Sequence, residues 1–178
     1  MISHSDDYVE YCRETARRAR DPHDLALRGR DNKDVTRRIH QEIADATGLC
    51  AADDLVDVGC GEGTMLRLAQ EAGAHSALGL LATDEEVAVV RRCGLNVRQG
   101  LTDQLPLPDQ CASIVVCNSV LLVVPRHKVP ASLSGYFGSP GQEREYLSAR
   151  FLSLNLEIRR LSSTAAAKCF PIFIANTV

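Results

Sequence analysis

The sequence predicts an α/β domain in which helices flank a parallel sheet. Three observations support this prediction. Short apolar runs alternate with helical patterns, the first strong run enters a glycine-rich turn, and the polar motifs follow the ends of the expected strands. Ligands of parallel sheets bind beyond the carboxyl ends of the strands. A chain of 178 residues is long enough for one such core and short for two.

Two helices are expected before the first strand. Residues 8–20 have a polar helical pattern that Asp21-Pro22 closes, and residues 35–47 have a second pattern that ends at Gly48. We therefore expect residues 1–48 to form an N-terminal helical region that contacts substrate or covers the site.

The next segment, residues 49–134, is expected to form the ligand-binding core. Strands are expected at 55–58, 76–81, 95–98 and 111–117, and helices at 62–72 and 83–93. The second of these helices starts at a capping box, because the hydroxyl of Thr83 and the carboxylate of Glu86 can each accept from the other's backbone N–H.

The most informative stretch is the loop Asp57–Gly63, which reads Asp-Val-Gly-Cys-Gly-Glu-Gly. Glycine has no Cβ, so the backbone can turn sharply and its N–H groups can approach a ligand. The spacing G-x-G-x-G follows an acid directly, whereas the dinucleotide-binding fingerprint is G-x-G-x-x-G with an acid about 20 residues later. The stretch resembles the first motif of the class I S-adenosylmethionine-dependent methyltransferases.

This resemblance covers about residues 50–130 and implies a Rossmann-like sheet that binds S-adenosylmethionine. In the family the loop lies along the methionine part of the cofactor, and the acid helps to fix the loop and the cofactor's amino group. The cofactor-binding residues that it implies here are Asp57, Gly59, Cys60, Gly61 and Gly63.

Three further cofactor positions follow from the resemblance. Leu81 stands where the family usually has an acid for the ribose hydroxyls, so either Asp84 reaches the ribose or the cofactor binds more weakly. Leu101 replaces an acid for the adenine amino group, and either the backbone of Thr102 or the apolar side chain of Leu101 contacts the ring. Asn118 ends the strand that faces the transferable methyl group.

No catalytic residue is identified. Methyl transfer is an in-line displacement at a sulfonium carbon, so alignment of the acceptor can suffice without a base. Candidate substrate contacts are His127, Tyr8, Tyr11 and His23, each of which also fits an ordinary surface or packing role. Asp103 is either an adenine partner or a solvated loop acid.

Composition narrows the function classes. A net charge of −3 gives no basis for nucleic-acid binding, and the apolar runs are shorter than the roughly 18 residues of a membrane span. Seven cysteines without a C-x-x-C pair fit free thiols in a reducing compartment better than disulfides or zinc. We expect a cytoplasmic methyltransferase that uses S-adenosylmethionine and a small-molecule acceptor, without metal, membrane or nucleic acid.

Two alternatives stay open, and the oligomeric state is not specified. The first is a non-catalytic cofactor-binding or partner-binding domain of the same fold, which Leu81 and Leu101 favour. The second is a nicotinamide-dependent oxidoreductase, which the glycine spacing disfavours.

The segment 135–178 differs from the rest of the chain. No Asp occurs after Asp109, serines accumulate, and glycines and a proline interrupt residues 134–141. A helix is expected at 146–161 and an edge strand at 170–174. This atypical C-terminal segment either completes the sheet or is an out-of-frame ending that leaves the fold truncated.

Overall fold

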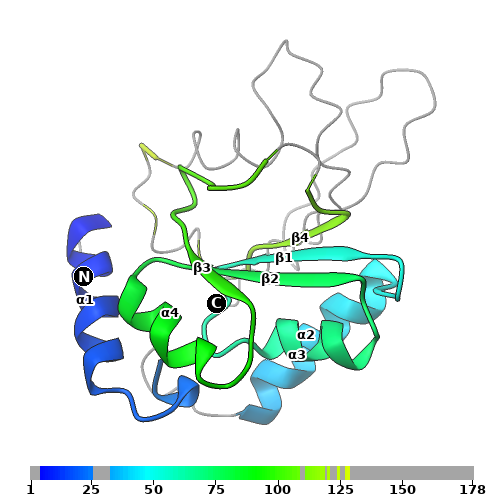
Figure 1. Ribbon diagram of the computed structural model, residues 1–178, viewed down its shortest axis with the longest axis horizontal. Helices are drawn as coiled ribbons and strands as arrows, with labels where there is room; N and C mark the ends of the chain where they lie inside the picture. Colours follow the sequence, from blue (N-terminus) through cyan, green and yellow to red (C-terminus); the bar gives the residue numbers. More distant parts are fainter. Residues whose placement is uncertain are drawn as a thin grey trace.

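The computed structural model describes residues 5–25, 33–108, 111–118, 120, 124 and 127–128. Helices precede the first strand and then alternate with strands (Figure 1). In chain order the elements are α1 Ser5–Arg18, the 3-10 helix η1 Pro22–Leu25, α2 Lys33–Thr47, β1 Asp54–Val58, α3 Thr64–Glu71, β2 Ser76–Leu81, α4 Asp84–Arg91, β3 Val97–Gln99 and β4 Ile114–Val116. Each helix and strand expected between residues 8 and 117 is confirmed, with ends that differ by a few residues.

The four strands form one sheet in the order β3-β2-β1-β4, and every pair is parallel. In the central strand β1, Asp57 lies in register with Gly79 of β2 and Val116 of β4. The carboxyl ends of these three strands therefore meet at one edge of the sheet. The loops that follow them hold the motifs singled out in the sequence, and the predicted α/β class with a parallel sheet is confirmed.

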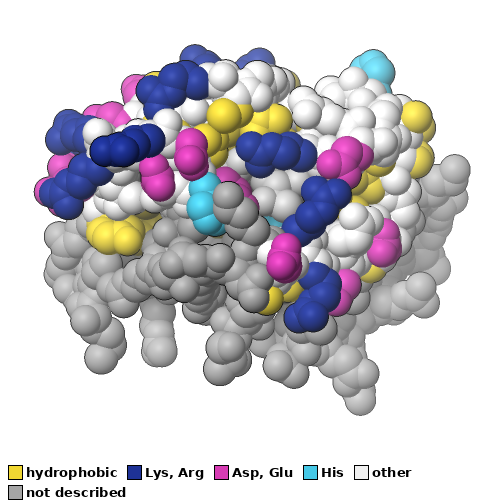
Figure 2. Space-filling view, turned by 90° about the horizontal axis from the view of Figure 1, so that it is seen from below, with side chains coloured by type: hydrophobic (Ala, Val, Ile, Leu, Met, Phe, Trp, Pro, Cys, Tyr) yellow, Lys and Arg dark blue, Asp and Glu magenta, His cyan; other side chains and the backbone are white. Residues whose placement is uncertain are grey.

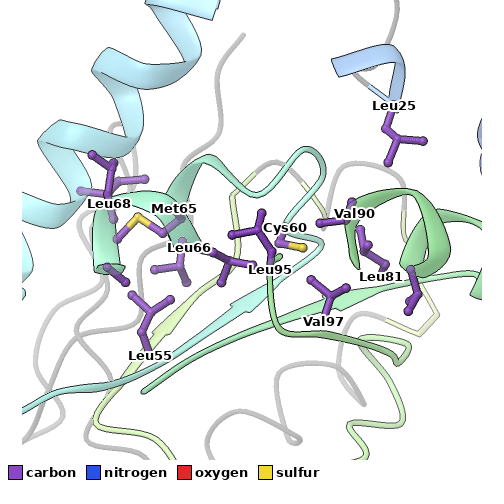
Figure 3. Close-up of a cluster of buried hydrophobic side chains, with 14 of the residues drawn as sticks. Leu25, Leu55, Cys60, Met65, Leu66, Leu68, Leu81, Val90, Leu95 and Val97 are labelled. Atoms are coloured by element: carbon purple, nitrogen blue, oxygen red, sulfur yellow. The ribbon is translucent and has the colours of Figure 1, made fainter. Parts of the chain in front are cut away.

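The described α-helices share one core with the sheet. In Figure 1, α2, α3 and α4 lie on one side of the strands and α1 lies beside α4. The core of this face contains the labelled side chains of Figure 3, which are Leu25, Leu55, Cys60, Met65, Leu66, Leu68, Leu81, Val90, Leu95 and Val97. Burial of this apolar surface is the main stabilising contribution to the fold.

The second face of the sheet has a separate apolar cluster. Val56, Val58, Leu80, Val115 and Cys117 are buried there, and partly buried loop residues such as Leu105 and Leu107 pack against them. The alternation of strands and helices predicts helices on both faces of the sheet, whereas α2, α3 and α4 all lie on the first face (Figure 1). The helix expected at 146–161, the strand at 170–174 and the two alternatives for residues 135–178 lie outside the described residues.

Helix α1 is fixed to α4 by charge as well as by packing. The Glu85 Oε1 atom lies 3.2 Å from the Arg17 guanidinium and 3.5 Å from Arg13 Nε. Glu85 is therefore engaged by α1, while Asp84 is exposed in the first turn of α4.

The capping box at the start of α4 is confirmed. Thr83 Oγ1 accepts from the Glu86 amide at 3.2 Å, and Glu86 Oε2 accepts from the Thr83 amide at 3.1 Å. Thr83→Ala removes a buried cap, so we expect the free energy of unfolding to fall by about 1 to 2 kcal/mol. Urea unfolding measures the change. Thr83→Ser keeps the hydroxyl and is the control, and equal losses in the two variants would contradict the cap's contribution.

Candidate functional site

The loop between β1 and α3 depends on glycines with positive φ. Gly59, Gly61 and Gly63 have φ values of 72°, 51° and 82°. A Cβ would overlap the Val120 side chain at Gly59 and the Leu95 side chain at Gly63, whereas no atom of the described residues lies within 4 Å of a Cβ built at Gly61. The outer glycines are thus required by packing, and the middle glycine faces open space.

The loop is fixed to the sheet while keeping unused donors. The amides of Gly59 and Cys60 donate to the Leu80 carbonyl at 2.8 and 3.1 Å, and Gly63 donates to the Cys60 carbonyl at 2.8 Å. Within the described ranges we find no acceptor for the amides of Gly61 and Glu62. No side chain caps the start of α3 either. Backbone N–H groups that have no acceptor can donate to an anionic group of a ligand.

Asp57 is a buried acid without a complete set of partners. The residue is 2% exposed, and its Oδ2 atom has no hydrogen-bond partner among the described residues. Burial raises the pKa of Asp57 to about 7. A buried carboxylate oxygen without a donor is costly unless it is protonated or receives a ligand. The site therefore contains an unsatisfied acceptor directly before the glycine loop.

The Cys60 side chain belongs to the core. It is 6% exposed and lies in the helix-face cluster (Figure 3). Burial, together with the nearby Asp57 carboxylate, raises the pKa of the Cys60 thiol. Cys60 is thus a structural residue of the loop, and its buried thiol is not a reactive thiolate.

The residues expected at the ribose and adenine lie near the loop in different environments. Leu81 is 2% exposed and its side chain packs in the helix-face core, while its carbonyl accepts from the Gly100 amide at 2.9 Å. Thr102 is buried and Leu101 is half-buried. Asp103 forms an ion pair with Lys128, with 3.2 Å between Oδ2 and Nζ, which favours its role as a loop acid.

The remaining sequence candidates are dispersed. Asn118 is half-buried just after β4, and His127 is exposed. The rings of Tyr8 and Tyr11 stack with centroids 6.4 Å apart. Burial raises the pKa of Tyr8, whose hydroxyl forms a side-chain hydrogen bond with Cys12. These contacts support a packing role for Tyr8 in α1.

Sequence reasoning did not single out Glu62, which the structure places at the centre of the loop. Its Oε2 atom lies 2.8 Å from His23 Nδ1, and its Oε1 atom accepts from the Thr64 hydroxyl at 2.9 Å. Its carbonyl accepts from the Arg67 guanidinium at 2.8 Å. The sequence signal that could have identified Glu62 is a charged residue between two glycines, Gly61 and Gly63.

Other chemistry is not indicated in the described part of the chain. That part contains no group of three or more His, Cys, Asp or Glu residues able to hold a metal ion, and its six cysteines are free. None of its helices combines the length and apolarity needed to traverse a bilayer. Figure 2 shows the helix side of the molecule, where cationic and anionic side chains are interspersed. One ion pair of α2 and α3 joins Arg37 and Glu71 at 2.8 Å.

This fold and loop define a class I methyltransferase-like architecture, in which a glycine-rich turn follows the central strand of a parallel sheet. Residues 56–133 match the family model described as a methyltransferase domain. Over that stretch the chain is therefore similar to this methyltransferase family. The suspected relationship and the Rossmann-like fold class are confirmed.

Solved structures share this fold. Phosphoethanolamine N-methyltransferase 1 of Haemonchus contortus, in complex with phosphoethanolamine and S-adenosylhomocysteine, matches with a TM-score of 0.59 and 16% identity over 72% of this chain and 28% of its own. A SAM-dependent methyltransferase from Archaeoglobus fulgidus matches with a TM-score of 0.51 and 19% identity over 59% of this chain and 47% of its own.

The (4+2)-cyclase SpnF matches with a TM-score of 0.52 and 22% identity over 69% of this chain and 50% of its own. The matched part thus spans no more than half of any of these three solved chains. No curated protein sequence matches the chain significantly.

Proposed function

We propose that the chain binds S-adenosylmethionine at the Asp57–Gly63 loop and transfers its methyl group to a small-molecule acceptor. The observation that supports this most directly is the buried Asp57 Oδ2 atom, which has no donor among the described residues, beside a loop whose Gly61 and Glu62 amides have no acceptor there. The methionine part of S-adenosylmethionine has an ammonium and a carboxylate. The ammonium complements the Asp57 carboxylate, and the carboxylate complements the loop amides.

The described residues fit the cofactor in three ways. Asp57 accepts from the ammonium, and the amides of Gly61 and Glu62 donate to the carboxylate. The open space at Gly61 leaves room for the ligand to approach the backbone. When bound, the cofactor supplies an electrophilic methyl group on a sulfonium, so the protein's task is to align the acceptor and exclude water.

The remaining contacts belong to the same proposal. The backbone of Thr102 and the side chain of Leu101 would contact the adenine, Leu81 would stand at the ribose position, and Asn118 would contact the cofactor or the acceptor. Because residue 81 is a leucine, it offers the ribose hydroxyls no carboxylate acceptor. A missing bond to a charged acceptor weakens binding by about 1.5 to 3 kcal/mol.

A small acceptor and a cytoplasmic location complete the proposal. The net charge of −3 and the mixed charges on the helix face are unlike the basic surface of a nucleic-acid enzyme. The six free cysteines in the described part of the chain fit a reducing compartment.

One observation favours a second candidate, a non-catalytic domain of the same fold. Leucine at position 81 leaves the ribose without a carboxylate acceptor, and weaker cofactor binding is compatible with loss of turnover. A fold of this kind does not by itself specify methyl transfer. Binding of S-adenosylhomocysteine without turnover on a broad acceptor panel would favour this candidate.

Calorimetry with S-adenosylhomocysteine tests the proposed cofactor, and NAD is the matched control ligand. We expect saturable one-to-one binding of S-adenosylhomocysteine and no heat from NAD. At a ligand concentration of about 100 Kd, the folded protein should gain about 2.7 kcal/mol in stability. Binding of NAD in place of S-adenosylhomocysteine would support the oxidoreductase alternative, and binding of neither would refute the proposal.

A further inference from the structure

Glu62 connects the glycine loop to a segment far away in the sequence. His23 belongs to η1 and lies 39 residues before Glu62 in the chain. The two side chains are 29% and 18% exposed, so their 2.8 Å contact is partly sheltered from water. A sheltered contact of this kind is stronger than a fully exposed ion pair.

The direction of the hydrogen bond follows from its partners. An ionised carboxylate only accepts, so His23 Nδ1 must have a proton in order to donate to Glu62 Oε2. The same bond forms with a neutral Nδ1–H imidazole or with imidazolium. The contact therefore persists whether or not the ring is charged.

η1 is itself firmly placed. Pro22 and Leu25 are buried, and Leu25 belongs to the helix-face core (Figure 3). The His23 amide donates to Asp21 Oδ1 at 2.8 Å. The position of η1 is thus set by core packing, and its His23 side chain can hold a loop residue in place.

The loop needs such a contact because its glycines allow many backbone conformations. Gly61 and Gly63 flank Glu62, and glycine samples more backbone conformations than any other residue. His23, Thr64 and Arg67 together hold both carboxylate oxygens and the carbonyl of Glu62. A loop restrained in this way loses less conformational entropy when it binds a ligand.

We propose that His23 is a positioning residue, which holds Glu62 and so preorganises the glycine loop for its ligand. The effect on affinity rests on the proposed cofactor site, whereas the effect on loop order does not. His23 acts through Glu62 and has no assigned contact with the cofactor.

Hydrogen exchange and calorimetry on the full chain test this proposal with four single variants and one double variant. His23→Ala removes the donor, His23→Asn keeps an amide N–H near the position of Nδ1, and Glu62→Ala removes the acceptor. His75→Ala is the control, because His75 Nδ1 makes a similar 2.7 Å contact with Asp54 at the opposite end of β1.

In His23→Ala we expect the hydrogen-bonded amides of Gly59, Cys60 and Gly63 to exchange about 5- to 20-fold faster and S-adenosylhomocysteine to bind more weakly by a similar factor. His23→Asn should recover most of both losses. The double variant His23→Ala with Glu62→Ala should match Glu62→Ala alone. His75→Ala should change neither the exchange of these amides nor the affinity.

The outcomes separate this proposal from the proposed function. Unchanged loop exchange in His23→Ala overturns the positioning role, as do additive effects of the two alanine substitutions. If the wild-type protein does not bind S-adenosylhomocysteine while His23→Ala still accelerates loop exchange, the positioning role stands and the cofactor proposal fails.

Discussion

Asp57→Asn is expected to stabilise the ligand-free protein at neutral pH and to weaken S-adenosylhomocysteine binding. Burial raises the pKa of Asp57 from 3.8 to about 7. Between these values the folded protein holds a proton that the unfolded chain releases, so stability falls as pH rises from about 4 to 7. Asparagine does not ionise, so the variant avoids this loss.

At pH 7.5 we expect a gain in the free energy of unfolding on the order of 3 kcal/mol, shrinking toward pH 4. Urea unfolding at several pH values measures this trend. Asp54→Asn is the control on the same strand, because the Ser76 hydroxyl and then His75 lower the pKa of Asp54. Its carboxylate is stabilising once ionised, so this variant should lose stability above pH 4.

The same substitution has an opposite effect on the ligand. If the cofactor's ammonium bonds to ionised Asp57, Asp57→Asn should weaken binding about 10- to 100-fold. Near pH 6, wild-type binding should release a proton, which calorimetry detects as a heat that depends on the buffer. Asp54→Asn should bind like wild type. Undiminished affinity in Asp57→Asn would remove Asp57 from the site.

Gly61→Ala is expected to abolish most cofactor binding at a modest cost in stability. The residue has a φ of 51°, and a Cβ built there meets nothing within 4 Å. An L-residue in this conformation costs about 1 to 2 kcal/mol. The added methyl group would occupy the space through which the ligand approaches the backbone. One blocked N–H donor contributes roughly 1.4 kcal/mol to binding, so we expect at least a tenfold loss of affinity.

Gly73→Ala is a matched control for this variant. Gly73 follows α3, has a φ of 70°, and also has nothing within 4 Å of a built Cβ. The two variants should therefore lose similar stability in urea unfolding, while only Gly61→Ala loses S-adenosylhomocysteine binding. Equal affinities in both variants would place the ligand elsewhere.

Much of the fold was predictable because its signals are local. The capping box of Thr83 and Glu86, the stop at Gly48 and the glycine spacing after β1 each depend on residues within a few positions of one another. Alternation of strands with helices then favoured a parallel sheet, which the order β3-β2-β1-β4 confirms. Strand ends were less accurate, since β4 is shorter than the apolar run that predicts it.

For the candidate site, too, local features were predictable from the sequence and long-range contacts were not. By itself, the sequence determined the glycine loop, its preceding acid and the absence of a carboxylate at position 81, because these are facts of residue type and spacing. Only the tertiary structure decided that Leu81 packs in the core, that Asp57 Oδ2 has no donor among the described residues, and that His23 contacts Glu62. Burial and contacts between residues distant in sequence depend on how the elements pack, and a local pattern does not encode that packing.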